Sequence, residues 1–225
     1  MFRELASDLW VIDQPLRFLG IEIGARTTMI RLRDGSLFVH SPGRLDAALI
    51  GELNARGPVH FVIAPNRFHH LFVADYQRAF AGAGFYCAPG LEVKRRDLKF
   101  KAILSDVAPA DWRGQIEQVV FHTFGALNEV VFFHRASGTL IFTDLMFNLT
   151  RSASMLGRIV LKLDGAFGAP AVPRSFRTML KWHRAATRVL VDRVLGWDFE
   201  RVVLAHGEVI ECDGKRIVDE AWDFV

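Results

Sequence analysis

The chain has 225 residues, 51% of them hydrophobic, which is enough to bury the core of one sizeable domain. Its formal net charge of +3 is too small to indicate nucleic-acid binding by itself. Two cysteines, Cys87 and Cys212, show no metal-ligand spacing, so a reduced compartment is favoured over a disulfide framework. With no secretory signal and no apolar run of about 18 residues, we expect a cytoplasmic protein that does not cross a membrane.

The first half of the chain alternates predicted strands and helices. The expected elements are strands at 8–13, 27–33 and 36–40, a helix at 46–54, a strand at 60–64, a helix at 71–83 and a strand at 85–88. The Asp34-Gly35 pair predicts a hairpin turn between two of these strands.

The second half is similar only in the coarse order of its elements, and the sequence contains no internal repeat. We expect strands at 115–122, 129–135 and 139–143, a mixed stretch at 146–171, a helix at 173–196, a strand at 201–205 and a terminal helix or strand at 217–225. The whole pattern predicts a layered α/β arrangement of two sheets faced by helices.

Ionisable side chains follow the ends of several predicted strands. They are His69 and His70 after strand 60–64, His122 at the end of strand 115–122, Asp144 after strand 139–143, and His206 after strand 201–205. Ligand sites in layered α/β folds collect at such strand ends. Imidazole and carboxylate ligands suit zinc, iron or manganese. Taken singly, each residue also fits a structural role, such as a buried histidine or a helix cap, and only their joint placement favours a metal site.

The order of these features resembles the metallo-β-lactamase superfamily over nearly the whole chain. The matching features are the His-rich loop, the motif His122-Thr123-Phe124-Gly125, the apolar strand before Asp144, and His206-Gly207; residues 40–43 stand where the family usually has Asp-Thr-Gly. The resemblance implies a single domain over 1–225 with a four-layer αββα sandwich. It also implies a metal site between the sheets and the hydrolysis of esters, amides, thioesters or phosphodiesters by activated water.

The first family motif, His-x-His-x-Asp-His, is degenerate in this chain. Aligned on His70, it places Pro65 and Arg67 where the first two histidines stand, and His69 where the aspartate stands. Two ligands of the first metal position are therefore absent. The resemblance is to an uncharacterised branch with a Pro-Asn-x-x-His-His loop, for which no activity is implied.

The resemblance implies one metal at the second position, with His69, His70, Asp144 and His206 as its ligands. His122 matches the remaining histidine of the first position. Zinc is the first choice of metal, with iron or manganese as alternatives. Asp144 serves as a ligand or as a base.

Other side chains are predicted to bind the substrate or to orient the metal ligands. Asn66, Arg67 and Arg151 are predicted to bind substrate. Glu129 is a candidate to orient a histidine, with a solvent-exposed carboxylate as the alternative. A basic helical insertion around 146–196 suits a small anionic substrate, although a solvated helix face explains the same charges.

Two functions remain open at this point. The first is a metal-dependent hydrolase acting on an ester, amide or phosphoester. The second is a metal-free, non-catalytic binding or scaffold protein, in which Arg67 occupies the first metal position and pairs with Asp144. The basic stripe alone supports a third, nucleic-acid role, and a homodimer stays open as the assembly.

Overall fold

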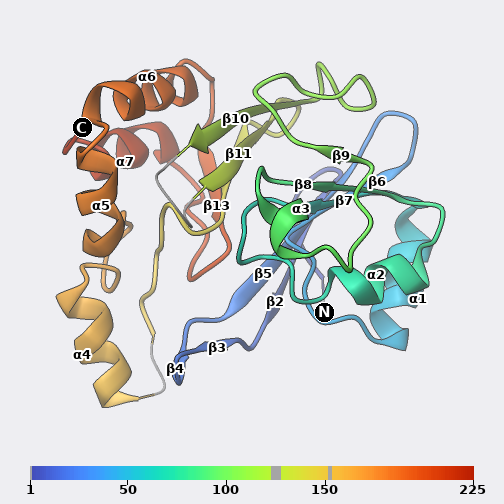
Figure 1. Ribbon diagram of the computed structural model, residues 1–225, viewed down its shortest axis with the longest axis horizontal. Coiled ribbons are helices and arrows are strands. Elements are labelled where there is room, and N and C mark those ends of the chain that lie inside the picture. The colour runs from blue at the N-terminus through green and yellow to red at the C-terminus, as the bar shows by residue number, and fades with distance from the viewer. Residues whose placement is uncertain (1, 123–127, 152–153) are drawn as a thin grey trace.

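The computed structural model describes residues 2–122, 128–151 and 154–225 (Figure 1). Its larger sheet has seven strands in the order β1-β2-β5-β6-β7-β8-β9. These strands are β1 (Arg3–Ala6), β2 (Leu9–Gln14), β5 (Ala25–Arg31), β6 (Leu37–His40), β7 (Val59–Ala64), β8 (Gly84–Cys87) and β9 (Ala102–Ile103). The strands from β1 to β6 pair antiparallel, and those from β6 to β9 pair parallel.

The smaller sheet has four strands, β10 (Ile116–His122), β11 (Asn128–His134), β12 (Thr139–Phe142) and β13 (Arg201–Leu204). The pairs β10–β11 and β11–β12 are antiparallel, whereas β12 and β13 are parallel. Because β12 and β13 run in the same direction, the residues that follow them emerge at one edge of the sheet. A separate hairpin of β3 (Arg17–Phe18) and β4 (Ile21–Glu22) connects β2 and β5 and projects beyond the ends of these two strands (Figure 1).

Apolar side chains fill three layers. Phe38, Phe132 and Ile141 belong to the core between the two sheets, and each is fully buried. The outer face of the larger sheet is covered by α1 (Ala47–Arg56), α2 (Val73–Ala79) and α3 (Leu91–Lys94). The outer face of the smaller sheet is covered by α5 (Arg174–Lys181), α6 (Arg184–Leu195) and α7 (Gly214–Ala221). The predicted four-layer αββα sandwich is therefore confirmed.

The segment predicted as one helix over 173–196 is two helices. The break falls at Trp182 and His183, where the Thr187 hydroxyl donates to the carbonyl of Leu180. Helix α4 (Met155–Leu163) lies within the stretch predicted as mixed, and the C-terminal element is helical. No helix in the described ranges is long and apolar enough to cross a membrane.

Candidate metal centre

Three predicted site residues meet where the edges of the two sheets come together. His69 follows β7, Asp144 follows β12 and His206 follows β13. The Asp144 Oδ1 atom lies 3.1 Å from His206 Nε2 and 3.4 Å from His69 Nε2. One ligand atom from each residue lies within 4.8 Å of the others. All three side chains are at most about a tenth exposed.

The orientation of the His206 ring is set by its other nitrogen. His206 Nδ1 lies 2.7 Å from the carbonyl oxygen of Gly24, which can only accept a hydrogen bond. Nδ1 therefore carries the proton, and in a neutral ring the Nε2 lone pair faces the Asp144 carboxylate. Such a pair repels unless a cation lies between the two atoms, either a proton on Nε2 or a metal ion.

His69 is oriented by Ser41, at the end of β6. The Ser41 hydroxyl lies 2.6 Å from His69 Nδ1, and Ser41 itself has a left-handed backbone with φ of 55°. Burial lowers the pKa of His69, but the Asp144 charge and hydrogen bond outweigh burial and raise it overall. The position therefore attracts positive charge.

The two carboxylate oxygens of Asp144 have different partners. The side-chain amide of Asn66 donates to Asp144 Oδ2 at 2.6 Å, leaving Oδ1 to face the two histidines. Burial by itself would raise the pKa of Asp144, but His69 and His206 hold it well below the usual range. Asp144 is thus a carboxylate across the ordinary pH range.

Glu129 on β11 holds the backbone of the Asp144 loop. Its carboxylate accepts hydrogen bonds from the backbone N–H groups of Thr143, Asp144 and Leu145, at 2.7, 2.6 and 3.1 Å. Burial, and then the nearby Asp144 charge, raise the pKa of Glu129 to about 7. Glu129 is 2% exposed, so it supports the Asp144 loop rather than facing solvent.

The donor set fits a metal ion of the zinc or iron type. Two ligands about 2.0–2.1 Å from a tetrahedral metal lie about 3.4 Å apart, close to the separations of Asp144 Oδ1 from the two imidazoles. Two histidines and one carboxylate leave coordination positions open, as catalytic zinc sites and non-haem iron sites do. Each imidazole also has the hydrogen-bond partner on its second nitrogen that metal-ligating histidines usually have.

The structure places the other two predicted ligands outside this cluster. His70 Nδ1 lies 2.7 Å from a guanidinium nitrogen of Arg95, and burial with the nearby Lys94 and Arg95 charges lowers its pKa to about 4. His122 is exposed at the end of β10, and residues 123–125 of its motif lie outside the described residues.

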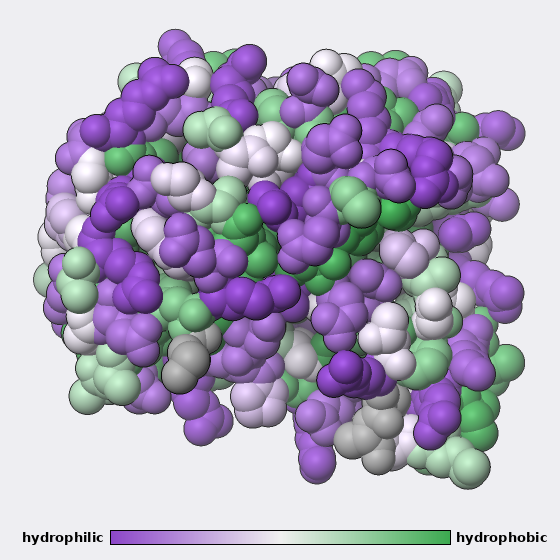
Figure 2. Space-filling view, turned by 180° about the vertical axis from the view of Figure 1, so that it is seen from behind, coloured by the Kyte–Doolittle hydropathy of each residue, from purple (hydrophilic) through white to green (hydrophobic). Residues whose placement is uncertain are grey.

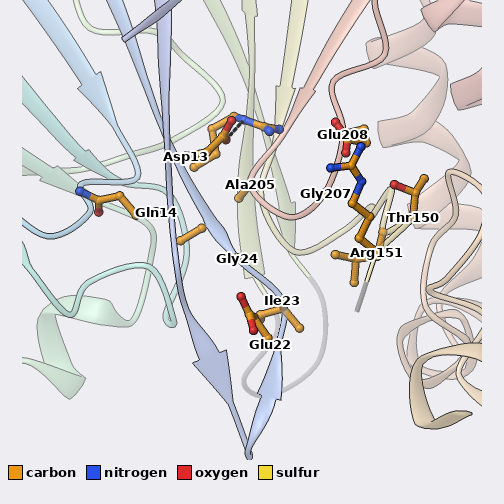
Figure 3. A pocket seen from close by; sticks show the side chains of 13 residues that line it. Asp13, Gln14, Glu22, Ile23, Gly24, Thr150, Arg151, Ala205, Gly207 and Glu208 are labelled. Carbon is orange, nitrogen blue, oxygen red and sulfur yellow. Dashed lines mark hydrogen bonds and ion pairs between the residues drawn. The ribbon is translucent and has the colours of Figure 1, made fainter. Parts of the chain in front are cut away.

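The predicted substrate-binding residues separate in space. Asn66 is buried and bound to Asp144, so its amide is committed within the site. Arg67 lies beside Gly90, and a methyl group in place of the glycine hydrogen would come within 3.7 Å of the Arg67 side chain. Arg151 lines a separate polar cavity of about 480 Å³, beside Thr150 and Glu208 (Figure 3).

A second cavity, of about 500 Å³, opens onto the cluster itself. His69, Asp144 and His206 form part of its lining. The two cavities share Ile23 and Ala25, so the segment that supplies the Gly24 carbonyl separates them. Figure 3 shows Asp13 and Glu208 on the wall of the polar cavity, and Asp13 pairs there with Arg26 at 2.6 Å.

Sequence patterns did not assign roles to Ser41 or to the Gly24 carbonyl. Ser41 follows directly after a strand, which is the same signal that singled out Asp144 and His206. Gly24 acts through its backbone, which no side-chain pattern can indicate.

Solved structures that superimpose on this chain define the class of fold. The DIM-1 metallo-β-lactamase is 13% identical with a TM-score of 0.65, over 99% of this chain and 96% of that one. The mono-zinc form of the metallo-β-lactamase FIM-1 from Pseudomonas aeruginosa is 11% identical with a TM-score of 0.62, over 99% of this chain and 94% of that one. The metal-soaked Flv1 flavodiiron core from Synechocystis sp. PCC6803 is 13% identical with a TM-score of 0.68, over 99% of this chain and 60% of that one. The chain therefore has the metallo-β-lactamase fold.

The sequence then gives the particular family. The family model described as "Domain of unknown function (DUF4336)" matches residues 6–166, and the chain belongs to that family. No curated protein matches the sequence.

Proposed function

We propose that this chain is a metal-dependent hydrolase with one metal held by His69, Asp144 and His206. The observation that carries the proposal is the fixed direction of the His206 ring. Its Nδ1 proton is committed to Gly24, and its Nε2 is directed at a carboxylate oxygen 3.1 Å away. A divalent cation at this point satisfies both histidines and the carboxylate together.

The chain's own residues hold the ligands in place before any substrate binds. Ser41 and the Gly24 carbonyl fix the two imidazole rings, and Asn66 occupies the oxygen of Asp144 that does not face them. Asp144 is therefore best suited to act as a ligand, because its remaining oxygen is the one that faces both histidines. A divalent metal held there supplies Lewis acidity and lowers the pKa of water towards about 7, so that hydroxide is available at neutral pH.

A metal-free binding protein is the competing function. In that case a proton on each imidazole would take the place of the metal, since both rings already lie within reach of Asp144. A metal-free protein in which Arg67 pairs with Asp144 has less support. Asp144 instead pairs with the two histidines, and Arg67 lies beside Gly90.

Elemental analysis separates the two functions. Untagged protein reconstituted with Zn²⁺, Fe²⁺ or Mn²⁺ should retain about one equivalent, and His206→Ala should retain below about 0.2 equivalents. His70→Ala is the matched control, because His70 pairs with Arg95 and should leave metal content unchanged. Wild-type protein that retains less than about 0.2 equivalents of every metal would refute the hydrolase proposal.

A further inference from the structure

The walls of the cavity over the His69, Asp144 and His206 cluster are mostly apolar. Its floor carries His69, Asp144 and His206, while most of the remaining lining is aliphatic or aromatic. The apolar lining residues include Phe18, Ile21, Phe68, Phe72, Val160 and Leu161. A volume of about 500 Å³ lies in the range of small-molecule sites.

Segments far apart in the sequence build these walls. The β3–β4 hairpin supplies one side, the loop after β7 another, and α4 a third. The hairpin and α4 lie together, since Ile21 and Ile23 pack against the cluster that contains Leu161. In Figure 1 both elements are at the lower edge of the molecule.

The same two elements expose large apolar side chains around the cavity. Phe18 is 55% exposed and Leu19 is 87% exposed at the hairpin tip, and Val160, which also lines the cavity, is 43% exposed on α4. Hydrophobic residues reach the surface at the lower right of Figure 2, the side on which α4 lies in that view. Contiguous exposed apolar surface at a cavity mouth is typical of a binding site for an apolar ligand.

The charges on the rim specify the rest of the ligand. Lys94 lines the cavity, and its pKa is lowered by burial and by the nearby Arg67 and Arg95 charges. Arg17 also lines the cavity and forms no ion pair with any described residue. The acidic group on the wall, Asp164, already accepts hydrogen bonds from the backbone and hydroxyl of Ser175. Asp164 keeps its negative charge but is engaged by Ser175, so Lys94 and Arg17 are the rim side chains that can pair with an anionic group of a ligand.

We propose that this cavity binds a single acyl chain of an anionic amphiphile, with the chain against α4 and the hairpin and the anionic group at Lys94 and Arg17. As an assignment of substrate class, the proposal rests on the proposed function, and it names fatty-acyl esters or thioesters of an anionic alcohol or thiol as the substrates. In their hydrolysis the oxygen of one water bonds to the acyl carbon and the C–O or C–S bond breaks. The leaving group takes one proton, and the second passes to solvent as the carboxylic acid ionises.

The test is calorimetric titration with laurate below its micelle concentration, in EDTA and again with Zn²⁺. Laurate should bind saturably in EDTA, while acetate, which lacks the chain, and dodecyltrimethylammonium, which has the opposite charge, should bind at least about tenfold more weakly. An affinity for acetate or dodecyltrimethylammonium equal to that for laurate, or no saturable laurate binding, would overturn the proposal.

Two variants on α4 localise the ligand. Val160 is 43% exposed and lines the cavity, whereas Ile159 is 49% exposed and does not line it. Val160→Asp should weaken laurate binding at least about tenfold, because it places a charge against an apolar chain, and Ile159→Asp should change it less than about threefold. Equal effects of the two variants would overturn the assignment to this cavity.

Vesicles of phosphatidylcholine and phosphatidylglycerol test a bilayer as the source of the chain. Sedimentation with vesicles that is lost in Ile159→Asp, without laurate binding in solution, would assign the apolar surface to a membrane and overturn the cavity proposal. Because laurate is titrated with and without metal, the two proposals fail separately. Laurate binding without metal retention refutes only the hydrolase, and metal retention without laurate binding refutes only the acyl site.

Discussion

The side chain of Asn66 joins the His69 loop to Asp144. Its Nδ2 donates to Asp144 Oδ2 at 2.6 Å, and its Oδ1 accepts from the backbone N–H groups of Phe68 and His69 at 2.9 and 2.8 Å. Asn66 follows a strand of the larger sheet and Asp144 follows a strand of the smaller one, so this contact crosses between the sheets. One amide thus fixes the position of a histidine ligand relative to the carboxylate ligand.

Replacing this amide should weaken metal binding more than it changes the fold. Asn66→Ala removes a partner that orients two ligands, and such losses usually reduce metal affinity about 10–100-fold. Gln118→Ala is the control, because Gln118 is similarly buried but its side-chain amide donates to the Ser105 carbonyl. Competition against a zinc chelator measures both affinities. Wild-type affinity in Asn66→Ala would show that the amide does not organise the site.

Sequence patterns could place Asp144 and His206 at the site because each follows an apolar strand, and parallel neighbouring strands end at one edge. The same reasoning could not choose between His69 and His70. Adjacent loop residues point in different directions, and the choice depends on the loop conformation. Here the Asn66 side chain fixes the backbone at His69, and Arg95, at the C-terminal end of α3, binds His70.

The acyl cavity is also beyond sequence patterns. Each wall is a short apolar segment that resembles ordinary core in the sequence, and α4 lies within the stretch predicted as mixed. Only the fold brings the β3–β4 hairpin, α4 and Phe147 around one cavity. Likewise, only the fold brings Lys94 of α3 and Arg17 of β3 to the rim of the same cavity.

Metal affinity should fall as the pH falls, starting above the ordinary pKa of histidine. The raised pKa of His69 means that a proton competes with the metal for this ring at higher pH than for a free imidazole. Calorimetric titration of Zn²⁺ at pH 7 in two buffers of different ionisation enthalpy should show net proton release on binding. Ser41→Ala removes the hydroxyl that orients the His69 ring and serves as a comparison. Binding without proton release would contradict the protonation assigned to His69.

His40 should make the protein less stable in acid. Its ring lies between the sheets, 5.3 Å from that of Phe132, and neither ring nitrogen has a hydrogen-bond partner among the described residues. Burial, and secondarily the charge of His69, lower the pKa of His40 to about 3. The unfolded chain takes up this proton below about pH 6.5 and the folded chain does not, so stability is lost as the pH falls from 6.5 towards 3.

From pH 7.5 to 5.0, His40 alone should remove about 2 kcal/mol from the free energy of unfolding. His40→Leu should lose this part of the pH dependence while changing stability at pH 7.5 by less than about 1.5 kcal/mol, because it replaces an unpartnered polar ring with an apolar group. His60→Leu is the control, since His60 is exposed on β7. Urea unfolding at both pH values gives the comparison. Identical pH dependence in wild type and His40→Leu would rule out His40 as the source.

Gly207 should tolerate no side chain, because the loop that carries His206 packs directly against residue 148. Its φ is +93°, and a Cβ atom would lie 2.0 Å from the carbonyl oxygen of Asn148. That carbonyl accepts the N–H of Glu208 at 2.8 Å, so it cannot move away without breaking the loop. Gly207→Ala should therefore lower the free energy of unfolding by at least about 2 kcal/mol and reduce metal retention.

Gly51→Ala provides the matched comparison, because nothing lies within 4 Å of the Cβ position of Gly51 in α1. Removing a glycine from an exposed helix interior should raise the free energy of unfolding by about 0.5–1 kcal/mol. Urea unfolding followed by zinc analysis of the folded protein measures both effects. If Gly207→Ala were as stable as wild type, the close contact with Asn148 could not be what positions His206. Metal loss in Gly207→Ala but not in Gly51→Ala would show that the backbone at Gly207 positions His206 for metal binding.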